Sequence, residues 1–170
     1  MINYFIKFKG EHLALPPKAT ITSIIFAWIG GFIAISSVAV LTNIAEHPLV
    51  LGSFGASCVL LFGFPKSPFS QPRNVILGHF LSSLIGLTFY HFIGDAWWSL
   101  GMALATAISV MIVTRTVHPP AGSNPVIVFL AGAKWTFLLT PTLIGAIILV
   151  VVALFYINID KKQHYPSYWF

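Results

Sequence analysis

The sequence predicts an all-α integral membrane protein. The expected fold is a polytopic transmembrane helical bundle with four long spans and two short, broken half-helix segments in a 3+3 inverted repeat. Hydrophobic residues make up 57% of the 170-residue chain and charged residues only 8%, whereas soluble domains carry about 25% charged residues. Long and short apolar runs also follow one another in the same order twice. Lipid must therefore solvate most of the protein surface.

The chain opens with an arm, residues 1–19, that mixes apolar residues with Lys7, Lys9 and Lys18. Such an arm is expected to lie on the cytoplasmic membrane surface. The transmembrane domain is expected over residues 20–160, since about 20 apolar residues cross a hydrocarbon core of about 30 Å. The runs long enough to span are Ile21–Ile44, Val75–Ile93, Trp97–Val117 and Phe137–Ile159.

Two shorter apolar runs, Gly52–Phe64 and Gly122–Ala133, lie between the long ones. As helices, each would cover roughly 18 Å at about 1.5 Å per residue, which is too short to cross alone. Each is therefore predicted to be a half-helix completed by non-helical backbone. If both runs re-enter without crossing, the chain has four spans, and if each crosses with its lead-in, it has six.

The placement of basic residues favours six spans with both termini inside, because positive charges gather in cytoplasmic loops. Only Lys134 would then lie outside, whereas four spans would divide the basic residues almost equally. Residues 161–170 would form a cytoplasmic tail. The basic residues placed inside are Lys7, Lys9, Lys18, Lys66, Arg73, Arg115, Lys161 and Lys162.

The two short runs open alike. His47-Pro48 is followed by Gly52-Ser53, and His118-Pro119-Pro120 is followed by Gly122-Ser123. Repeat 1 (about residues 20–94) and repeat 2 (about 96–160) would each hold three segments, so the second would be inverted relative to the first. Many transporters with this plan place paired broken helices near the membrane midplane. The alternative is a chance match in a chain rich in Gly, Ser and Pro.

The segment His118–Pro125 predicts a helix break. Two consecutive prolines remove two backbone donors and disfavour helix before them, so the third long helix should end near His118. Ser123 or Asn124 would cap a new half-helix with Pro125 in its first turn. The free N–H groups of that turn would favour an anion. The alternative is an ordinary corner between helices at the surface.

The first short run begins with Gly52, Ser53, Gly55 and Ser57. Small residues allow close helix packing, and they also let a ligand approach bare backbone. Ser53 and Ser57 are four residues apart, so their hydroxyls share one helix face. They could donate to an anion or bond backward to helix carbonyls.

Four further residues are candidates for the same site. Arg73 and Asn74 end the proline-rich linker, and His79 is an ionisable residue within a predicted span, where function is the default expectation. Arg115 would share a face with His118 if the helix persists. Basic residues here would draw anions toward a pore. The alternatives are membrane-surface anchors for the arginines and a packing role for His79.

Catalysis is not indicated. The four carboxylates lie at predicted ends or loops and form no pair suited to acid–base work, and no metal-binding motif is present. We therefore expect no enzyme activity, catalytic residue, metal or cofactor. The scarcity of carboxylates also argues against a cation pathway, and the isolated basic residues argue against nucleic-acid binding. The carboxylates are Glu11, Glu46, Asp95 and Asp160.

Several motifs in order resemble one family, the HPP integral membrane proteins, whose name describes the triplet at His118–Pro120. The resemblance runs from about residue 12 to 160. The resembling segments are Leu51–Ser57, Phe62–Pro68, Gln71–Asn74, Gly78-His79, Thr114–Pro120 and Leu139–Ala146.

This resemblance implies a membrane domain usually described with four helices and associated with solute transport. Members in cyanobacteria and chloroplasts are associated with nitrite. Some members carry a C-terminal pair of CBS modules, which this chain is expected to lack because it stops soon after its last span. Ala121 replaces a glycine common in the family, and Asn124-Pro125 replaces smaller residues, so the substrate is left open.

The sequence hypothesis is a transporter or channel for a small inorganic anion, with nitrite the leading candidate, in a bacterial inner (plasma) membrane. The expected partners are that anion, membrane lipid and further copies of the chain in a homo-oligomer. The alternative is a non-transporting scaffold or receptor subunit. The predicted binding residues are Gly52, Ser53, Gly55, Ser57, Arg73, Asn74, His79, Arg115, His118, Pro119, Pro120, Gly122, Ser123 and Asn124.

Overall fold

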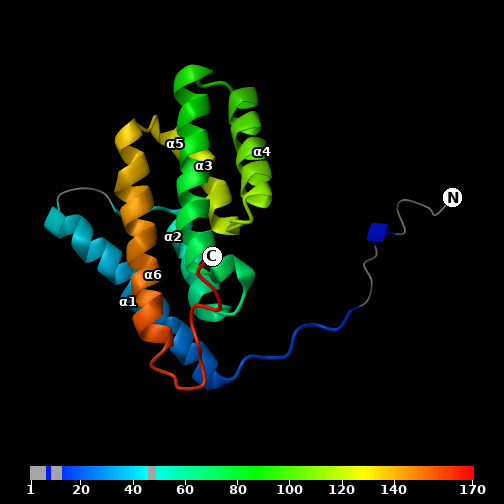
Figure 1. The fold of residues 1–170 in the computed structure, drawn as a ribbon, viewed down its shortest axis with the longest axis vertical. Helices are drawn as coiled ribbons and strands as arrows, with labels where there is room; N and C mark the ends of the chain where they lie inside the picture. Colours follow the sequence, from blue (N-terminus) through cyan, green and yellow to red (C-terminus); the bar gives the residue numbers. More distant parts are fainter. Residues whose placement is uncertain (1–6, 9–12, 46–48) are drawn as a thin grey trace.

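The computed structural model describes residues 7–8, 13–45 and 49–170, and this part of the chain is helical without strands (Figure 1). The all-α prediction is confirmed for these residues. The elements are α1 (Ile21–Ala45), α2 (Ser53–Cys58), η2 (Val59–Gly63), η3 (Pro68–Ser70), α3 (Pro72–Phe92), α4 (Trp97–Val113), η4 (Pro119–Ser123), α5 (Asn124–Ala131), η5 (Trp135–Leu138), η6 (Leu139–Leu143) and α6 (Ile144–Ile157).

Three helical stretches in the described chain are long and apolar enough to cross a membrane: Ile21–Ile44, Pro72–Phe92 and Trp135–Ile157. The predicted third span is shorter than expected, because α4 has 17 residues and ends at Val113 instead of Val117. At about 1.5 Å per residue it covers about 25 Å. By length and composition the structure has three candidate spans, and the count of four long spans remains a prediction.

Helix α4 ends where Arg115 adopts a left-handed conformation, with φ of 56°. The Thr116 N–H donates to Met111 O at 2.9 Å and the Arg115 N–H to Ile112 O at 3.1 Å. This pairing is a Schellman motif, which satisfies the last carbonyls of a helix and usually has glycine at the left-handed position. The helix therefore does not persist to His118, so the condition under which Arg115 and His118 would share a helix face is not met.

The last apolar run is interrupted near its beginning. The sequence predicts one helix over Phe137–Ile159, but Thr140 has extended backbone angles, φ −124° and ψ 120°, between η5 and α6. Pro141 follows directly and lacks the N–H that a continuous helix would use there. The break is followed by Thr142, which lies in η6 just before α6 and is fully buried.

Helix α3 is the central element of the bundle. It packs against α4, α5 and α6, while α1 packs across α6 and η2 at the edge (Figure 1). Only 17% of the apolar stretch of α1 is buried, against 39% for α3, so the rest of the described chain leaves most of α1 uncovered. The described residues 13–20 are exposed and extend away from the helices.

Each half of the chain contains one short helical segment between two longer ones. In the first half the short segment is α2 with η2, and in the second it is η4 with α5, which ends at Gly132 in the left-handed conformation. The shared opening at His47-Pro48 lies outside the described residues. The inverted relation between the two halves remains a prediction.

The C-terminal residues return to the start of α3 (Figure 1). The Tyr165 hydroxyl donates to Ser70 O at 2.8 Å, and the Tyr168 hydroxyl donates to Asn74 Oδ1 at 3.2 Å. Tyr165 is buried although it follows the last helix by several residues. This segment therefore fixes the loop that leads into α3.

Candidate functional site: a polar chain between two helix breaks

One face of α3 packs closely against the break between α4 and α5. A Cβ atom added at Gly78 would lie 2.8 Å from His118 Cβ, and one added at Gly86 would lie 2.9 Å from Pro125 Cα. Between them on the same face, the Ser82 hydroxyl donates to Ala121 O at 2.6 Å. Because residues four apart share a helix face, the small side chains of α3 let the break approach its backbone closely.

The break carries His118 into the core, where its side chain is fully buried. Its Nδ1 lies 2.7 Å from Phe69 O. A carbonyl oxygen can only accept, so Nδ1 carries the hydrogen. In the neutral ring the other nitrogen, Nε2, is then a hydrogen-bond acceptor.

Ser57 on α2 bridges two histidines. Its Oγ lies 2.8 Å from His118 Nε2 and 2.9 Å from His79 Nε2. Since His118 Nε2 accepts, Ser57 donates to it, and Ser57 Oγ accepts from the Nε2–H of His79. Ser53 O, 3.2 Å from Ser57 Oγ, is a weaker alternative acceptor. The two imidazole rings themselves meet edge to face, with centroids 4.9 Å apart.

Asn124, the first residue of α5, continues the connection. Its Nδ2 lies 3.0 Å from His79 Nδ1, 2.8 Å from Ser83 Oγ and 3.2 Å from His79 O. Ser83 Oγ in turn lies 3.1 Å from Thr142 Oγ1, beyond the break before α6. Asn124 Oδ1 is buried and has no hydrogen-bond partner.

These contacts form one continuous hydrogen-bonded path, which we call the polar chain. It starts near Phe69 and ends near the middle of α3, because Ser83 lies about 16 Å along this helix at about 1.5 Å per residue. Every side chain in it is fully buried, and buried polar groups are stable only when paired. Its members are Ser57, His79, Ser83, His118, Asn124 and Thr142.

The sequence indicated Ser57, His79, His118 and Asn124 as site residues, and the structure brings these four into direct contact. It did not indicate Ser83 or Thr142. Two weak signals were present, namely a polar residue in the middle of an apolar span and a proline, Pro141, beside the threonine.

A groove of about 530 Å³ lies beside the polar chain, between the α2–η2 segment and the break before α5. Ser53 in its wall is only 3% exposed, yet its Oγ makes no hydrogen bond. Gly52 and Pro119 lie at the exposed side of the groove. The lining residues are Gly52, Ser53, Ala56, Val59, Leu60, Pro119, Pro120 and Ser123.

Ser123 does not cap α5 with its side chain, as the sequence suggested it could. Its hydroxyl donates instead to Pro120 O at 2.8 Å, and no side-chain cap is formed at this helix. Gly122 and Gly55 make no close backbone approach, since an added Cβ atom would meet nothing within 4 Å at either position.

The two predicted arginines do not line the groove. Arg73 Nη2 donates to Thr114 O at 2.9 Å, which ties α3 to the end of α4, and its buried Nε has no partner. Arg115 is exposed. Asn74 is 4% exposed and its Nδ2 donates to Val117 O at 3.0 Å. Arg73 and Asn74 thus hold the segment before His118 in place.

Within the described ranges, no group of three or more His, Cys, Asp or Glu side chains could hold a metal ion. Nor does any carboxylate there form a hydrogen bond with the polar chain. The site therefore consists of neutral hydroxyls, an amide and two imidazoles.

Comparison with known families gives a match to the HPP transmembrane region over residues 16–166, nearly the whole chain. The chain belongs to the HPP transmembrane family. Its HPP triplet is the segment His118–Pro120, at the junction of the polar chain and the groove. The expectation of an HPP protein, and of an integral membrane protein, is confirmed.

Two transmembrane proteins of Dictyostelium discoideum are similar to this HPP chain. One is 35% identical over 99% of the chain and 64% of its own length. The other is 36% identical over 99% of the chain and 58% of its own length. The chain thus spans about three fifths of these relatives. No solved structure matches it.

Proposed function

We propose that this HPP-family chain is a transporter or channel for a small monovalent anion, with nitrite the leading candidate. The single observation that carries the proposal is the groove between the α2–η2 segment and the break before α5, in which the buried hydroxyl of Ser53 has no partner. A buried donor without a partner costs free energy unless a ligand or water completes it. A small anion would accept that hydrogen bond.

The neighbourhood of the groove suits an anion better than a cation. None of the described residues that line it is a carboxylate, and non-helical backbone at membrane depth is tolerated where it lines a cavity. Arg73 and Arg115 lie near the end of α4 that leads into the second break. We assign them the role of drawing anions toward the groove rather than of binding them in it.

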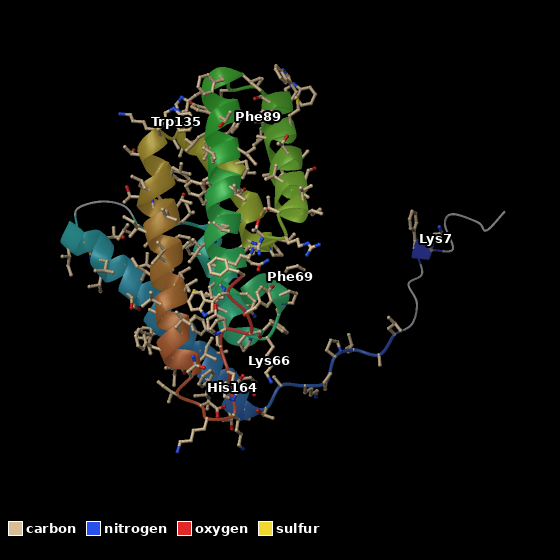
Figure 2. All side chains as sticks on the ribbon, viewed as in Figure 1. Lys7, Lys66, Phe69, Phe89, Trp135 and His164 are labelled. Carbon is tan, nitrogen blue, oxygen red and sulfur yellow. The ribbon has the colours of Figure 1, made fainter. Side chains whose placement is uncertain are left out.

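In this proposal, the distribution of basic residues sets which end of the bundle faces the cytoplasm. Figure 2 shows Lys66 and His164 at one end of the bundle and Phe89 and Trp135 at the other. The basic end would face the cytoplasm, with both termini there, in a bacterial inner membrane. The groove is open on the outside of a single chain, and in a homo-oligomer a neighbouring copy would cover it.

Uptake of nitrite, nitrate, formate and chloride into vesicles containing the purified protein tests the proposal. Ser53→Ala removes only a hydroxyl without a partner, so a structural effect is not expected. If Ser53 binds the anion, apparent affinity should fall about tenfold or more, because a hydrogen bond to a charged group contributes roughly 1.5–3 kcal/mol and about 1.4 kcal/mol is tenfold.

Ser99→Ala is the matched control, because Ser99 on α4 is also buried with an unpartnered hydroxyl but lies outside the groove. It should leave uptake unchanged. Ser123→Leu, which fills the groove, should block uptake. Equal rates for the wild type, Ser53→Ala and Ser123→Leu would reject the site.

The alternative is a scaffold or receptor subunit that moves no solute. One observation favours it: the side chains of the polar chain are mostly satisfied by one another, as in a packing device. Under this alternative the wild-type protein moves none of the four anions faster than protein-free vesicles do.

A further inference from the structure

We propose that the histidine pair bridged by Ser57 holds and passes one exchangeable proton, so that anion movement through this chain is coupled to proton movement. The inference rests on the proposed anion transport and adds its coupling ion. It is carried by the geometry of Ser57, His79, His118 and Asn124, whose side chains form an unbroken donor sequence.

In the neutral state all donors of this sequence point the same way. Asn124 Nδ2 donates to His79 Nδ1, His79 Nε2 to Ser57, Ser57 to His118 Nε2, and His118 Nδ1 to Phe69 O. Each ring carries one proton, and the Phe69 carbonyl fixes which nitrogen holds it. The only basic nitrogen not already facing a hydroxyl is His79 Nδ1.

Asn124 provides the place where an added proton is taken up. Turning its amide by a half-turn would bring the unpartnered Oδ1 to His79 Nδ1, which can then donate as N–H. The turned amide would set Oδ1 against the carbonyl of His79, where Nδ2 now donates at 3.2 Å. That repulsion makes the protonated state less stable, which keeps the proton exchangeable.

The transfer itself moves two hydrogens. His79 Nε2–H breaks as its proton joins Ser57 Oγ, and the original Ser57 O–H breaks as its proton joins His118 Nε2. Ser57 ends with one hydrogen as before, His79 is neutral, and His118 carries the added charge while donating to both Ser57 and Phe69 O. The proton comes from water or from the undissociated acid of the anion.

None of the described residues around the pair supplies a counter-ion for this charge. On α2, Ser57 and Phe54 contact the histidine pair. The Phe54 ring lies edge to face with His79, with ring centroids 5.1 Å apart. Cys58 lines a different groove with Ala27. On α5, Asn124 contacts His79 of the pair and also donates to Ser83 on α3.

The nearby cations point elsewhere, since Arg73 donates to Thr114 O and Arg115 is exposed. An anion in the groove would supply the missing charge, because the groove wall continues directly from His118 into Pro119 and Pro120. Opposite charges attract strongly at low dielectric. Protonation of the pair and anion occupancy therefore favour each other, and such coupling is reciprocal.

Nitrite and proton fluxes measured together in vesicles containing the full chain test the relay. With acid outside, wild-type protein should accumulate nitrite against its gradient, with about one proton entering per nitrite. Protein-free vesicles give the leak of the undissociated acid, which is subtracted. Ser57→Ala should lower the number of protons per nitrite at least tenfold, and Ser57→Thr should restore it.

Ser99→Ala serves again as the buried-serine control and should keep the wild-type ratio. If Ser57→Ala does not fold or stops both fluxes, His118→Gln replaces it, because Gln cannot titrate but can still donate to Phe69 O. An unchanged ratio in Ser57→Ala or His118→Gln overturns the relay, and so does failure of Ser57→Thr to restore coupling.

The two proposals fail separately. Wild-type nitrite flux without proton flux overturns the relay and leaves anion transport standing. Wild-type proton flux without flux of nitrite, nitrate, formate or chloride overturns anion transport and leaves a proton path. The absence of both fluxes above protein-free vesicles overturns both.

Discussion

Gly78 packs directly against His118: a Cβ atom added at Gly78 would lie 2.8 Å from His118 Cβ and 3.0 Å from Thr116 O. This contact sets how closely the HPP triplet approaches α3. It thereby fixes the distance from His118 to Ser57, whose hydroxyl must reach both histidines. Gly78, which has no side chain, thus allows His118 to reach its position beside Ser57.

Gly78→Ala should therefore push the break away from α3. We expect a loss of about 1–3 kcal/mol of stability, the usual cost of overpacking, together with loss of coupled nitrite uptake. Thermal melting in detergent measures the first effect. Gly101→Ala on α4 is the control, since nothing lies within 4 Å of its added Cβ, and its melting temperature should not fall. Equal melting of the two variants would refute the contact.

Arg115→Gly should stabilise the protein. Arg115 has φ of 56°, where a residue with a Cβ is less stable by roughly 1–2 kcal/mol. Arg115→Ala keeps that strain and should give no such gain. If Arg115 also draws anions toward the groove, both variants should lower nitrite uptake equally, so melting and uptake separate the two roles. A lower melting temperature for Arg115→Gly than for Arg115→Ala would contradict the backbone argument.

Tyr165→Phe should change the response to alkaline pH. Burial raises the pKa of the Tyr165 hydroxyl above its ordinary value of 10.0, and the hydroxyl donates to Ser70 O. The folded state keeps the proton while the unfolded chain ionises above about pH 10. The stabilisation is complete below that pH and is lost as pH rises through the folded-state pKa.

Below pH 10, the free energy of unfolding of the wild-type protein should therefore exceed that of Tyr165→Phe by about 1 kcal/mol, the contribution of one hydrogen bond. The wild-type melting temperature should be correspondingly higher. The difference should shrink and then reverse as the pH is raised further. Tyr168→Phe is the comparison, because Tyr168 is exposed. A difference between wild type and Tyr165→Phe that stays constant with pH would show that the hydroxyl does not titrate differently in the two states.

Thr142→Val tests the far end of the polar chain. The substitution keeps the shape but removes one of the two partners of the buried Ser83 hydroxyl and leaves Asn124 as the other, which should lower stability by about 1–3 kcal/mol. Thr142→Ser retains the hydroxyl and should lose less. Melting curves of the two variants give the comparison, and a Val variant as stable as the Ser variant would argue that this contact contributes nothing.

The sequence predicted the features that depend on local chemistry. Composition indicated lipid as the solvent, because so few charges cannot cover so much apolar surface in water. The consecutive prolines at 119 and 120 indicated the break before α5. These are properties of a residue and its immediate neighbours.

Other features were missed because they depend on distant parts of the chain. The helix before the HPP triplet stops at Val113 because Arg115 accepts a strained backbone conformation, which no local pattern favours. Ser83 and Thr142 meet across 59 positions, and each alone reads as an ordinary polar residue in an apolar run.

By itself, the sequence determined that this HPP protein is solvated by lipid and that a helix break lies at the HPP triplet, with its small and polar residues. Only the tertiary structure decided that Ser57 lies between two histidines and that the α2–η2 segment and the HPP triplet line one groove. The physical reason is that solvation and backbone propensity act over a few residues. The donor and acceptor partners of a buried side chain are set instead by which helices pack together.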